Sequence, residues 1–290
     1  MSEFPRTYDI RVRPPFKGFL NCVMYKGAAR TRSNAAARQM PLPGALDTLR
    51  LEDTIAECRA ANVAKALVPA RIVGNPMFDG VSNEDVMELV RLQPQLFTAA
   101  LAVEPFGGRA AADEVARFAK DPAVVAGVIE PGILDKPRYL DDRGIDPVWD
   151  ACRSLAMPVL AMGGGLAGPD VGYADPVYLD RVAARFPKLQ LLAVHGGWPY
   201  VTQILGVAFR RPNVHVCPDL YLPYLPGWRD YVDAANTYLQ DRFLYGTAYP
   251  FADFAAYSRS LLSMPFRKEV LPKVFHDNAE RLFGRRNAAS

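Results

Sequence analysis

The sequence predicts a (β/α)8 barrel, the α/β fold also called a TIM barrel. Short runs of apolar and β-branched residues recur at a spacing of roughly 30 residues, and segments of helical period separate them. Such runs are typical of parallel strands buried on both faces. Eight of them alternating with helices favour a closed barrel over an open sheet. The expected strands are Tyr8–Val12, Ala64–Pro69, Phe97–Val103, Val124–Ile129, Pro158–Ala161, Leu189–Val194, Val214–Pro218 and Phe243–Gly246.

The segments between the strands carry helical signals. Tyr178–Phe186 and Val201–Phe209 each place their apolar residues on one face at helical spacing, as an amphipathic helix does. Ser82 with Asp85 resembles a capping box before an apolar helix. Asp175, followed directly by a proline, resembles an N-cap with proline in the first turn. These signals predict helices between the strands.

Residues 14–47 depart from the alternation of strands and helices. The segment contains several prolines and glycines, and its basic residues include Arg30, Arg32 and Arg38. It is too long for an ordinary connection between a strand and a helix. In a barrel it would lie over the carboxyl-terminal mouth, where active sites are built. We expect a lid or a subunit contact there, with a plain surface excursion as the alternative.

Composition limits the classes of protein to consider. The 290 residues are enough for one barrel, so a single domain over residues 1–290 is expected. A net charge of +3 is too small to indicate nucleic acid or an acidic membrane as a partner, and no apolar run is long enough for a spanning helix. The four cysteines are scattered, and the N-terminus lacks the features of a signal peptide. Reduced thiols in the cytoplasm are the simplest expectation.

Several motifs of the chain point to one family. LLAVHGGWPYV spans Leu191 to Val201, and RFLYGTAYPF spans Arg242 to Phe251. With SNEDVMELVRLQPQLFTAALAVEP, YLDDRGIDPVWDACRSLAMPVLAMGGG, RRPNVHVCPDLY and HDNAERLFG, they resemble the amidohydrolase-related (amidohydrolase 2) family in order and over most of the chain. The resemblance implies a distorted TIM barrel of hydrolases and non-oxidative decarboxylases.

The resemblance also implies where a metal would be bound. Metal-binding members use two histidines after strand 1, a lysine or carboxylate after strand 4, histidines after strands 5 and 6, and an aspartate after strand 8. Arginine has no lone pair to donate, a methionine thioether suits Cu(I) better than zinc, and zinc needs at least three protein ligands. We therefore expect no metal and no other cofactor. The matching positions here are Arg11, Arg13, Glu130, Met162, His195 and Ala248.

Three arginines at the expected strand ends predict a site for a small anion. Arg11 and Arg13 lie two apart on the first strand, so both side chains can point to the same side. Arg71 follows the second strand. Guanidinium groups bind carboxylates bidentately, so a carboxylate-bearing substrate is expected. The alternative is that Arg11 or Arg13 forms a structural ion pair with Glu130 or Asp219.

His195 is the first candidate for general acid–base catalysis. Its pKa class suits proton transfer near neutrality, and the C-terminal end of a barrel strand is where catalytic residues lie. A histidine that only hydrogen-bonds a loop is the alternative. Asp219 and Glu130 complete the expected catalytic group. The residues expected to contact the substrate, besides the arginines, are Trp198, Tyr221 and Tyr249.

The leading functional hypothesis is a metal-independent hydrolase of a small carboxylate-bearing lactone or ester. The family is similar to 2-pyrone-4,6-dicarboxylate lactonases, in which arginines bind carboxylates without a catalytic metal. His195 or Asp219 would activate water, and Arg11 and Arg13 would stabilise the oxyanion. The alternatives are a decarboxylase or lyase of an aromatic or enol acid, and a non-catalytic barrel that binds a ligand. Residues 14–47 and Tyr221–Trp228 could form a homodimer contact.

Overall fold

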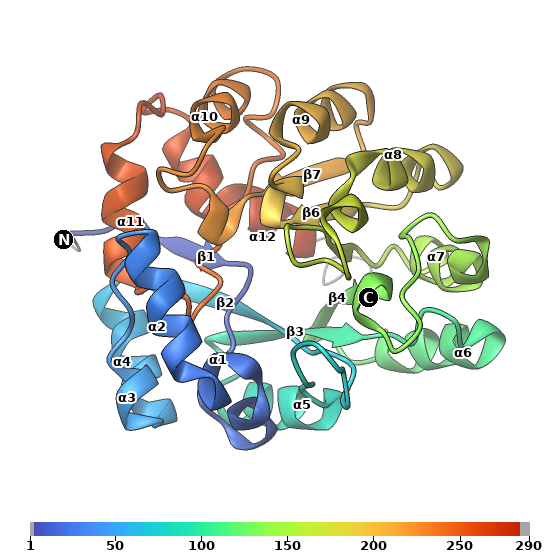
Figure 1. Ribbon diagram of the computed structural model, residues 1–290, viewed down its shortest axis with the longest axis horizontal. Helices are drawn as coiled ribbons and strands as arrows, with labels where there is room; N and C mark the ends of the chain where they lie inside the picture. The colour runs from blue at the N-terminus through green and yellow to red at the C-terminus, as the bar shows by residue number, and fades with distance from the viewer. Residues whose placement is uncertain (1–2, 285–290) are drawn as a thin grey trace.

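The structure is a computed structural model that describes residues 3–284, and its described residues form one sheet of seven parallel strands. The strands neighbour one another in chain order. Figure 1 shows the helices arranged around the outside of these strands. The prediction of a TIM-barrel-like α/β fold is confirmed. The strands are β1 (Thr7–Asp9), β2 (Val63–Pro69), β3 (Phe97–Ala102), β4 (Val124–Ile129), β5 (Val159–Met162), β6 (Leu191–Val194) and β7 (Val214–Cys217).

The eighth expected strand, Phe243–Gly246, closes the barrel without forming a regular ladder. The backbone N–H of Leu244 donates to the Val216 carbonyl on β7 at 2.9 Å. On its other side, the N–H of Ile10 donates to the Tyr245 carbonyl at 3.2 Å. The segment therefore has the predicted position between β7 and the chain after β1, but the prediction of a regular strand was wrong.

Helices follow the strands as the sequence predicts. The Ser82 hydroxyl accepts a hydrogen bond from the Asp85 N–H at 3.0 Å, and the Asp175 carboxylate accepts one from the Val177 N–H at 2.9 Å. Both predicted helix caps are therefore confirmed. The outer helices are α4 (Leu51–Ala60), α5 (Asn83–Leu92), α6 (Gly108–Phe118), α7 (Asp146–Ser154), α8 (Pro176–Arg185), α9 (Val201–Arg210), α10 (Trp228–Asn236), α11 (Phe254–Ser263) and α12 (Asn278–Gly284).

The segment expected as a long loop, residues 14–47, is largely helical. Its glycines and prolines separate short helices, and Gly27 and Gly44 each directly precede one. The helices are η1 (Lys17–Asn21), α1 (Val23–Lys26), α2 (Ala28–Ala37) and α3 (Ala45–Thr48). We call residues 17–48 the lid. The Asp253 N–H donates to the Pro41 carbonyl at 2.9 Å, which ties the lid to the loop after the eighth strand segment.

Apolar side chains fill the inside of the barrel. Ile10, Leu67, Leu160 and Leu192 belong to one fully buried cluster, and a larger cluster lies between the strands and the helices. Burying each such leucine contributes about 1.5–3 kcal/mol. The interior is a packed core, so a ligand must bind at the ends of the strands.

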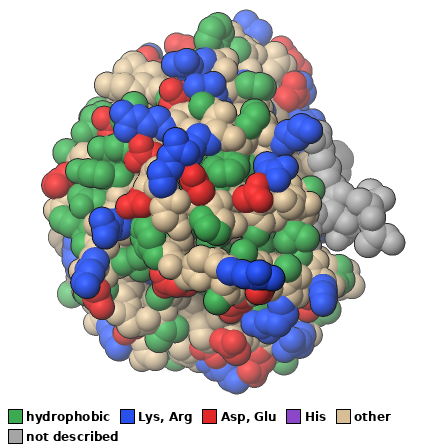
Figure 2. Space-filling model, turned by 90° about the vertical axis from the view of Figure 1, so that its right-hand side faces the viewer, with side chains coloured by type: hydrophobic (Ala, Val, Ile, Leu, Met, Phe, Trp, Pro, Cys, Tyr) green, Lys and Arg blue, Asp and Glu red, His purple; other side chains and the backbone are tan. Residues whose placement is uncertain are grey.

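The surface carries charges of both signs. Figure 2 shows one face on which Lys and Arg side chains are interspersed with Asp and Glu. That face has no extended basic patch of the kind that binds nucleic acid. Within residues 3–284, no helix combines the length and the apolar character needed to cross a membrane.

Candidate active site

A cavity of about 330 Å³ lies at the carboxyl-terminal ends of the strands. Its wall combines residues that follow strands with residues of the lid. Three predicted site residues, Arg13, Asp219 and Tyr249, are not part of the wall. The predicted residues that do line it are Arg11, Arg71, Glu130, His195, Trp198 and Tyr221.

Arg71 and Glu130 form a matched ion pair in this wall. The Arg71 Nε donates to Glu130 Oε2 at 3.0 Å, and Nη2 donates to Oε1 at 2.8 Å. Both side chains are buried. Burial raises the pKa of the Glu130 carboxyl, but the charge and hydrogen bonds of Arg71 outweigh it and hold the pKa below its ordinary value. This geometry makes Glu130 a carboxylate that orients Arg71, and it does not favour the proton-transfer role expected from the sequence.

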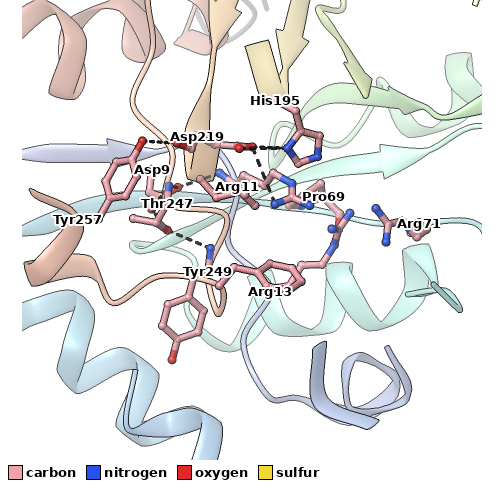
Figure 3. Close-up of polar contacts among 12 residues, drawn as sticks. Asp9, Arg11, Arg13, Pro69, Arg71, His195, Asp219, Thr247, Tyr249 and Tyr257 are labelled. Carbon is pink, nitrogen blue, oxygen red and sulfur yellow. Dashed lines mark hydrogen bonds and ion pairs between the residues drawn. The ribbon is translucent and has the colours of Figure 1, made fainter. Parts of the chain in front are cut away.

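His195 and Asp219 form the second charged group of the site. His195 Nδ1 lies 3.0 Å from Asp219 Oδ1 and 2.9 Å from Oδ2. Asp219 is fully buried, and its backbone carbonyl accepts a hydrogen bond from the Tyr257 hydroxyl at 2.7 Å (Figure 3). Asp219 therefore orients His195 from behind the wall, whereas the sequence had also suggested that it activates water.

The backbone at these two residues is unusual. His195 has φ = 67° and Asp219 has φ = 44°, both in the left-handed region. Ala248, at the position where the family carries an aspartate, shares this conformation with φ = 57°. Non-glycine residues seldom adopt it, and it is enriched at functional sites. Each of these residues follows the end of a strand segment, so the strained backbone lies at the barrel mouth.

The surroundings of His195 favour its neutral form. Burial lowers the pKa of its imidazole; the Asp219 carboxylate opposes that effect, and the Arg11 guanidinium adds to it. A neutral imidazole that donates from Nδ1 to Asp219 has a lone pair on Nε2. Because His195 lines the cavity, Nε2 is the atom available for proton exchange with a ligand.

Arg11 lies in the same wall with spare donors. Its Nη1 is 3.9 Å from Asp219 Oδ2, which is a loose contact, and its Nε has no hydrogen-bond partner within residues 3–284. Its backbone N–H donates to Asp9 Oδ1 at 2.9 Å. Asp9 also accepts hydrogen bonds from the Thr247 N–H and hydroxyl, so it joins the start of the barrel to its end (Figure 3). Arg11 is therefore held by its backbone while its guanidinium can bind an anion.

Arg13 and Tyr249 lie behind the cavity wall and do not line it. The Arg13 Nε donates to the Pro69 carbonyl at 2.9 Å, and the side chain is 1% exposed. The Tyr249 hydroxyl contacts Thr54 and Glu57, each at 2.8 Å. Although β1 ends at Asp9, Arg13 still lies near Arg11 and Arg71 (Figure 3), but of these three only Arg11 and Arg71 line the cavity. Substrate contact by Arg13 and Tyr249 is not supported.

The glycine run after β5 makes room for His195. A Cβ at Gly164 would lie 2.6 Å from the His195 Cβ, closer than side chains pack. A Cβ at Gly163 would meet no atom within 4 Å. Gly164 itself lines the cavity. The close approach of His195 is therefore the physical reason for a glycine at position 164.

Two aromatic rings form a flat part of the wall. Trp198 and Tyr221 are stacked with ring centroids 5.0 Å apart and an interplanar angle of 13°. The His195 ring meets the Tyr221 ring edge-on at 5.5 Å. Burial, as the largest cause, raises the pKa of Tyr221 to about 12, so its hydroxyl stays protonated. This surface suits a planar apolar group placed next to His195.

The lid supplies site residues that strand-end reasoning missed. Arg38, at the end of α2, lines the cavity with Asn34 one turn earlier. Its Nη2 donates to the Phe251 carbonyl at 2.9 Å, and its Nη1 to the Leu220 carbonyl at 3.4 Å. Arg38 belongs to the basic residues noted in the sequence, but only the phase of α2 shows which of them faces inward.

The curled parallel sheet, with a polar site at its carboxyl-terminal mouth, defines an α/β TIM barrel of the amidohydrolase superfamily. The chain belongs to the amidohydrolase family Amidohydro_2, whose model matches residues 20–285. Members of this family are generally enzymes.

Solved structures with the same fold include proteins of known and unknown activity. An uncharacterized TIM-barrel protein from Bordetella bronchiseptica is 34% identical, over 97% of this chain and 99% of that one, with a TM-score of 0.91. A 5-carboxyvanillate decarboxylase from Sphingomonas paucimobilis is 17% identical over 96% and 99%, with a TM-score of 0.65. A dihydroxybenzoic acid decarboxylase from Polaromonas, bound to manganese and the inhibitor 2-nitroresorcinol, is 14% identical over 97% of each chain, with a TM-score of 0.69. The two decarboxylases establish the fold alone, and no curated protein matches the chain.

The resemblance to metal-binding members of the family implies a metal among the residues at the strand ends. The residues of this chain do not fit one. Within residues 3–284, no three His, Cys, Asp or Glu side chains come together so that they could hold a metal ion. His195 and Asp219 bond to each other, Glu130 is occupied by Arg71, and Arg11 approaches the site as a cation. A second cation in this place would be repelled.

Proposed function

We propose that this protein is an enzyme that acts on a small carboxylate-bearing substrate without a catalytic metal. The observation that carries the proposal is that His195, oriented by buried Asp219, faces the same cavity as the strand-end arginines Arg11 and Arg71. Arginines bind and orient an anion, and a histidine beside them can exchange a proton with it. An orienting carboxylate, a proton-transfer group and anion-binding groups are the parts that such an enzyme needs.

Decarboxylation of an aromatic or enol acid is the reaction that the comparisons favour, since solved structures of this fold are named as decarboxylases. The stacked wall of Trp198 and Tyr221 supports a flat ring as substrate. In this reaction the imidazolium of His195 delivers a proton from Nε2 to the ring carbon that bears the carboxylate. The bond to the carboxylate then breaks, its electron pair stays with the ring, and carbon dioxide leaves. His195 regains its proton from solvent.

Hydrolysis of a lactone or ester, the leading hypothesis from the sequence, becomes the second candidate. The lowered pKa of His195 favours it, because a neutral imidazole can take a proton from water. The hydroxide equivalent then adds to the carbonyl carbon while Arg11 stabilises the oxyanion. The carbon–oxygen bond of the leaving group breaks, and the His195 imidazolium returns its proton to the leaving oxygen. Both reactions use the same side chains, with His195 starting in opposite protonation states.

The two reactions have different products, so one experiment separates them. Chelator-treated protein is incubated with hydroxylated benzoic acids and, separately, with carboxylate-bearing lactones. We expect release of carbon dioxide from at least one acid, measured directly, without added metal. Ring opening of a lactone, followed in a pH-stat, would favour the second candidate. Turnover that appears only after manganese is added would overturn the metal-independent proposal, and tight binding without any turnover would indicate a non-catalytic barrel.

The role of His195 is tested by substitution. His195→Asn should lower kcat by about 100- to 10 000-fold, the usual contribution of general acid–base catalysis, while substrate binding measured by calorimetry is retained. His215→Asn is the matched control, because His215 is the second residue of β7, does not line the cavity and hydrogen-bonds Gln190 at 3.0 Å. Equal losses in the two variants would remove His195 from the mechanism.

A further inference from the structure

The lid brings into the cavity a positive charge that the Asp219 carboxylate attracts only at a distance. Arg38 is half-buried and lines the cavity. Its two hydrogen bonds go to the neutral carbonyls of Leu220 and Phe251. Within residues 3–284, no carboxylate forms an ion pair with it. A guanidinium has five N–H donors, so Arg38 is anchored to the barrel loops and still has donors free for a ligand.

The other charges of the site do not compensate Arg38. Glu130 is matched by Arg71, and Asp219 is shared between His195 and the loosely placed Arg11. Asp9 is bound by backbone and hydroxyl donors in the barrel wall.

Behind the wall, the two terminal nitrogens of Arg13 also have no partner within the described residues. Figure 3 shows Arg13 near Arg11 and Arg71. The site therefore gathers four guanidinium groups around two carboxylates, an excess that is unfavourable in a buried place unless an anion balances it.

We infer that Arg38 is a specificity-determining residue that binds a second anionic group, so that the preferred ligand is a small dicarboxylate. This inference rests on the proposed function, in which the cavity binds a carboxylate. Arg11 and Arg71 follow barrel strands, whereas Arg38 belongs to the lid. The barrel arginines and the lid arginine can therefore bind different groups of one ligand. Asn34, one turn before Arg38 on α2, adds an amide donor on the same side. With a dicarboxylate bound, its two carboxylates together with Glu130 and Asp219 would balance the four guanidinium groups.

The inference is tested by comparing ligands that differ by one carboxylate. The probes are benzoate and the 1,2-, 1,3- and 1,4-benzenedicarboxylates, and the readout is the dissociation constant from isothermal titration calorimetry at pH 7.5. Wild-type protein should bind at least one diacid about 10-fold or more tightly than benzoate, the scale of one charge-assisted hydrogen bond. Arg38→Gln should abolish this preference and leave the affinity for benzoate unchanged within about 2-fold.

Two further variants complete the design. Arg38→Lys keeps the charge without the planar fork and should retain part of the preference. Arg30→Gln removes the same charge from an exposed position on the same helix and should change neither affinity. The wild-type comparison requires no variant, so the absence of a diacid preference overturns the inference even if Arg38→Gln does not fold, and Arg38→Lys then tests the residue.

Three results would overturn the inference: no diacid preferred by wild-type protein, a preference that survives in Arg38→Gln, or an equal loss in Arg30→Gln. The proposed function fails separately. It is contradicted if His195→Asn keeps full turnover, whatever the diacid preference. If wild-type protein prefers no diacid but its turnover still depends on His195, only the role of Arg38 is refuted.

Discussion

Two buried arginine–carboxylate pairs lie at the same barrel mouth, and they differ in how closely the guanidinium and the carboxylate approach each other. Arg71 and Glu130 meet bidentately at 2.8 and 3.0 Å. Arg11 and Asp219 are 3.9 Å apart, and Asp219 bonds instead to His195 at 2.9 Å. The first pair stands on ordinary backbone, whereas His195 and Asp219 both have positive φ.

The difference separates a matched structural ion pair, Arg71 with Glu130, from a reactive group made of Arg11, His195 and Asp219. In the matched pair the two charges compensate each other, so a change of protonation is unfavourable. Glu130 therefore serves to hold Arg71 in place. Asp219 is shared between His195 and Arg11, and Arg11 still has donors without a partner. A bound anion would change the charge around His195 and therefore the pKa of its imidazole. Substitutions in the two groups should therefore damage different properties of the protein.

The largest effect is expected in the reactive group. Asp219→Asn keeps the shape of the side chain but loses the charge that orients and stabilises the His195 imidazolium. We predict a fall in kcat of about 100- to 10 000-fold, with substrate affinity within about 10-fold of wild type. Steady-state kinetics and calorimetry measure the two quantities. Asp150→Asn, which removes an exposed partner of Arg153, is the control and should leave both unchanged.

The matched pair should instead determine stability. Glu130→Gln leaves the Arg71 charge buried without its counterion, which lowers the free energy of unfolding by about 3 kcal/mol. Urea denaturation measures this loss. Glu114→Gln breaks the exposed pair with Arg117 and should cost less than about 0.5 kcal/mol. If Glu130→Gln were as stable as its control, the distinction between the two groups would be lost.

A smaller effect on the reactive group is expected from its glycine neighbour. Gly164→Ala places a Cβ against His195, so the ring must shift, and a shift of this kind lowers kcat by about 10- to 100-fold. Gly163→Ala adds the same methyl group in open space and should behave like wild type. Equal activity of the two variants would show that His195 does not need its present position.

The smallest expected effect is the change of kcat/KM with pH. Burial holds the pKa of His195 below its ordinary value of 6.5, so the imidazolium is lost as pH rises through that lowered value. If the imidazolium donates the proton in decarboxylation, kcat/KM should fall about tenfold per pH unit above a midpoint lower than 6.5. The midpoint should move lower still in Asp219→Asn, because that carboxylate raises the pKa. A rate that increases with pH over this range would favour hydrolysis by the neutral imidazole.

Much of the fold could be predicted because buried parallel strands leave a strong local signal. The runs at Ala64–Pro69 and Val124–Ile129 agree with β2 and β4 to within one residue. The signal fails where the backbone is irregular. The first strand ends at Asp9 instead of Val12, and the eighth expected strand contributes only an isolated bridge between Phe243 and Val216.

The site could be predicted less well, because its contacts depend on geometry far along the chain. His195 and Asp219 were each expected at a strand end, yet their direct bond depends on the left-handed turn at both residues. Arg38 could not be chosen from the basic residues of the lid, because the segment carries no clear helical period. Arg71, Glu130 and His195, which follow regular strands, line the cavity as expected, whereas Arg38 of the lid could not be singled out.

The central claim is that an arginine-lined cavity performs its reaction without a metal. Metal content and turnover should be measured on the same chelator-treated preparation, with metal determined by plasma mass spectrometry. The account predicts far less than one metal ion per chain together with full turnover of the best substrate. A content near one zinc or manganese per chain, with activity lost on chelation and restored by that metal, would contradict it.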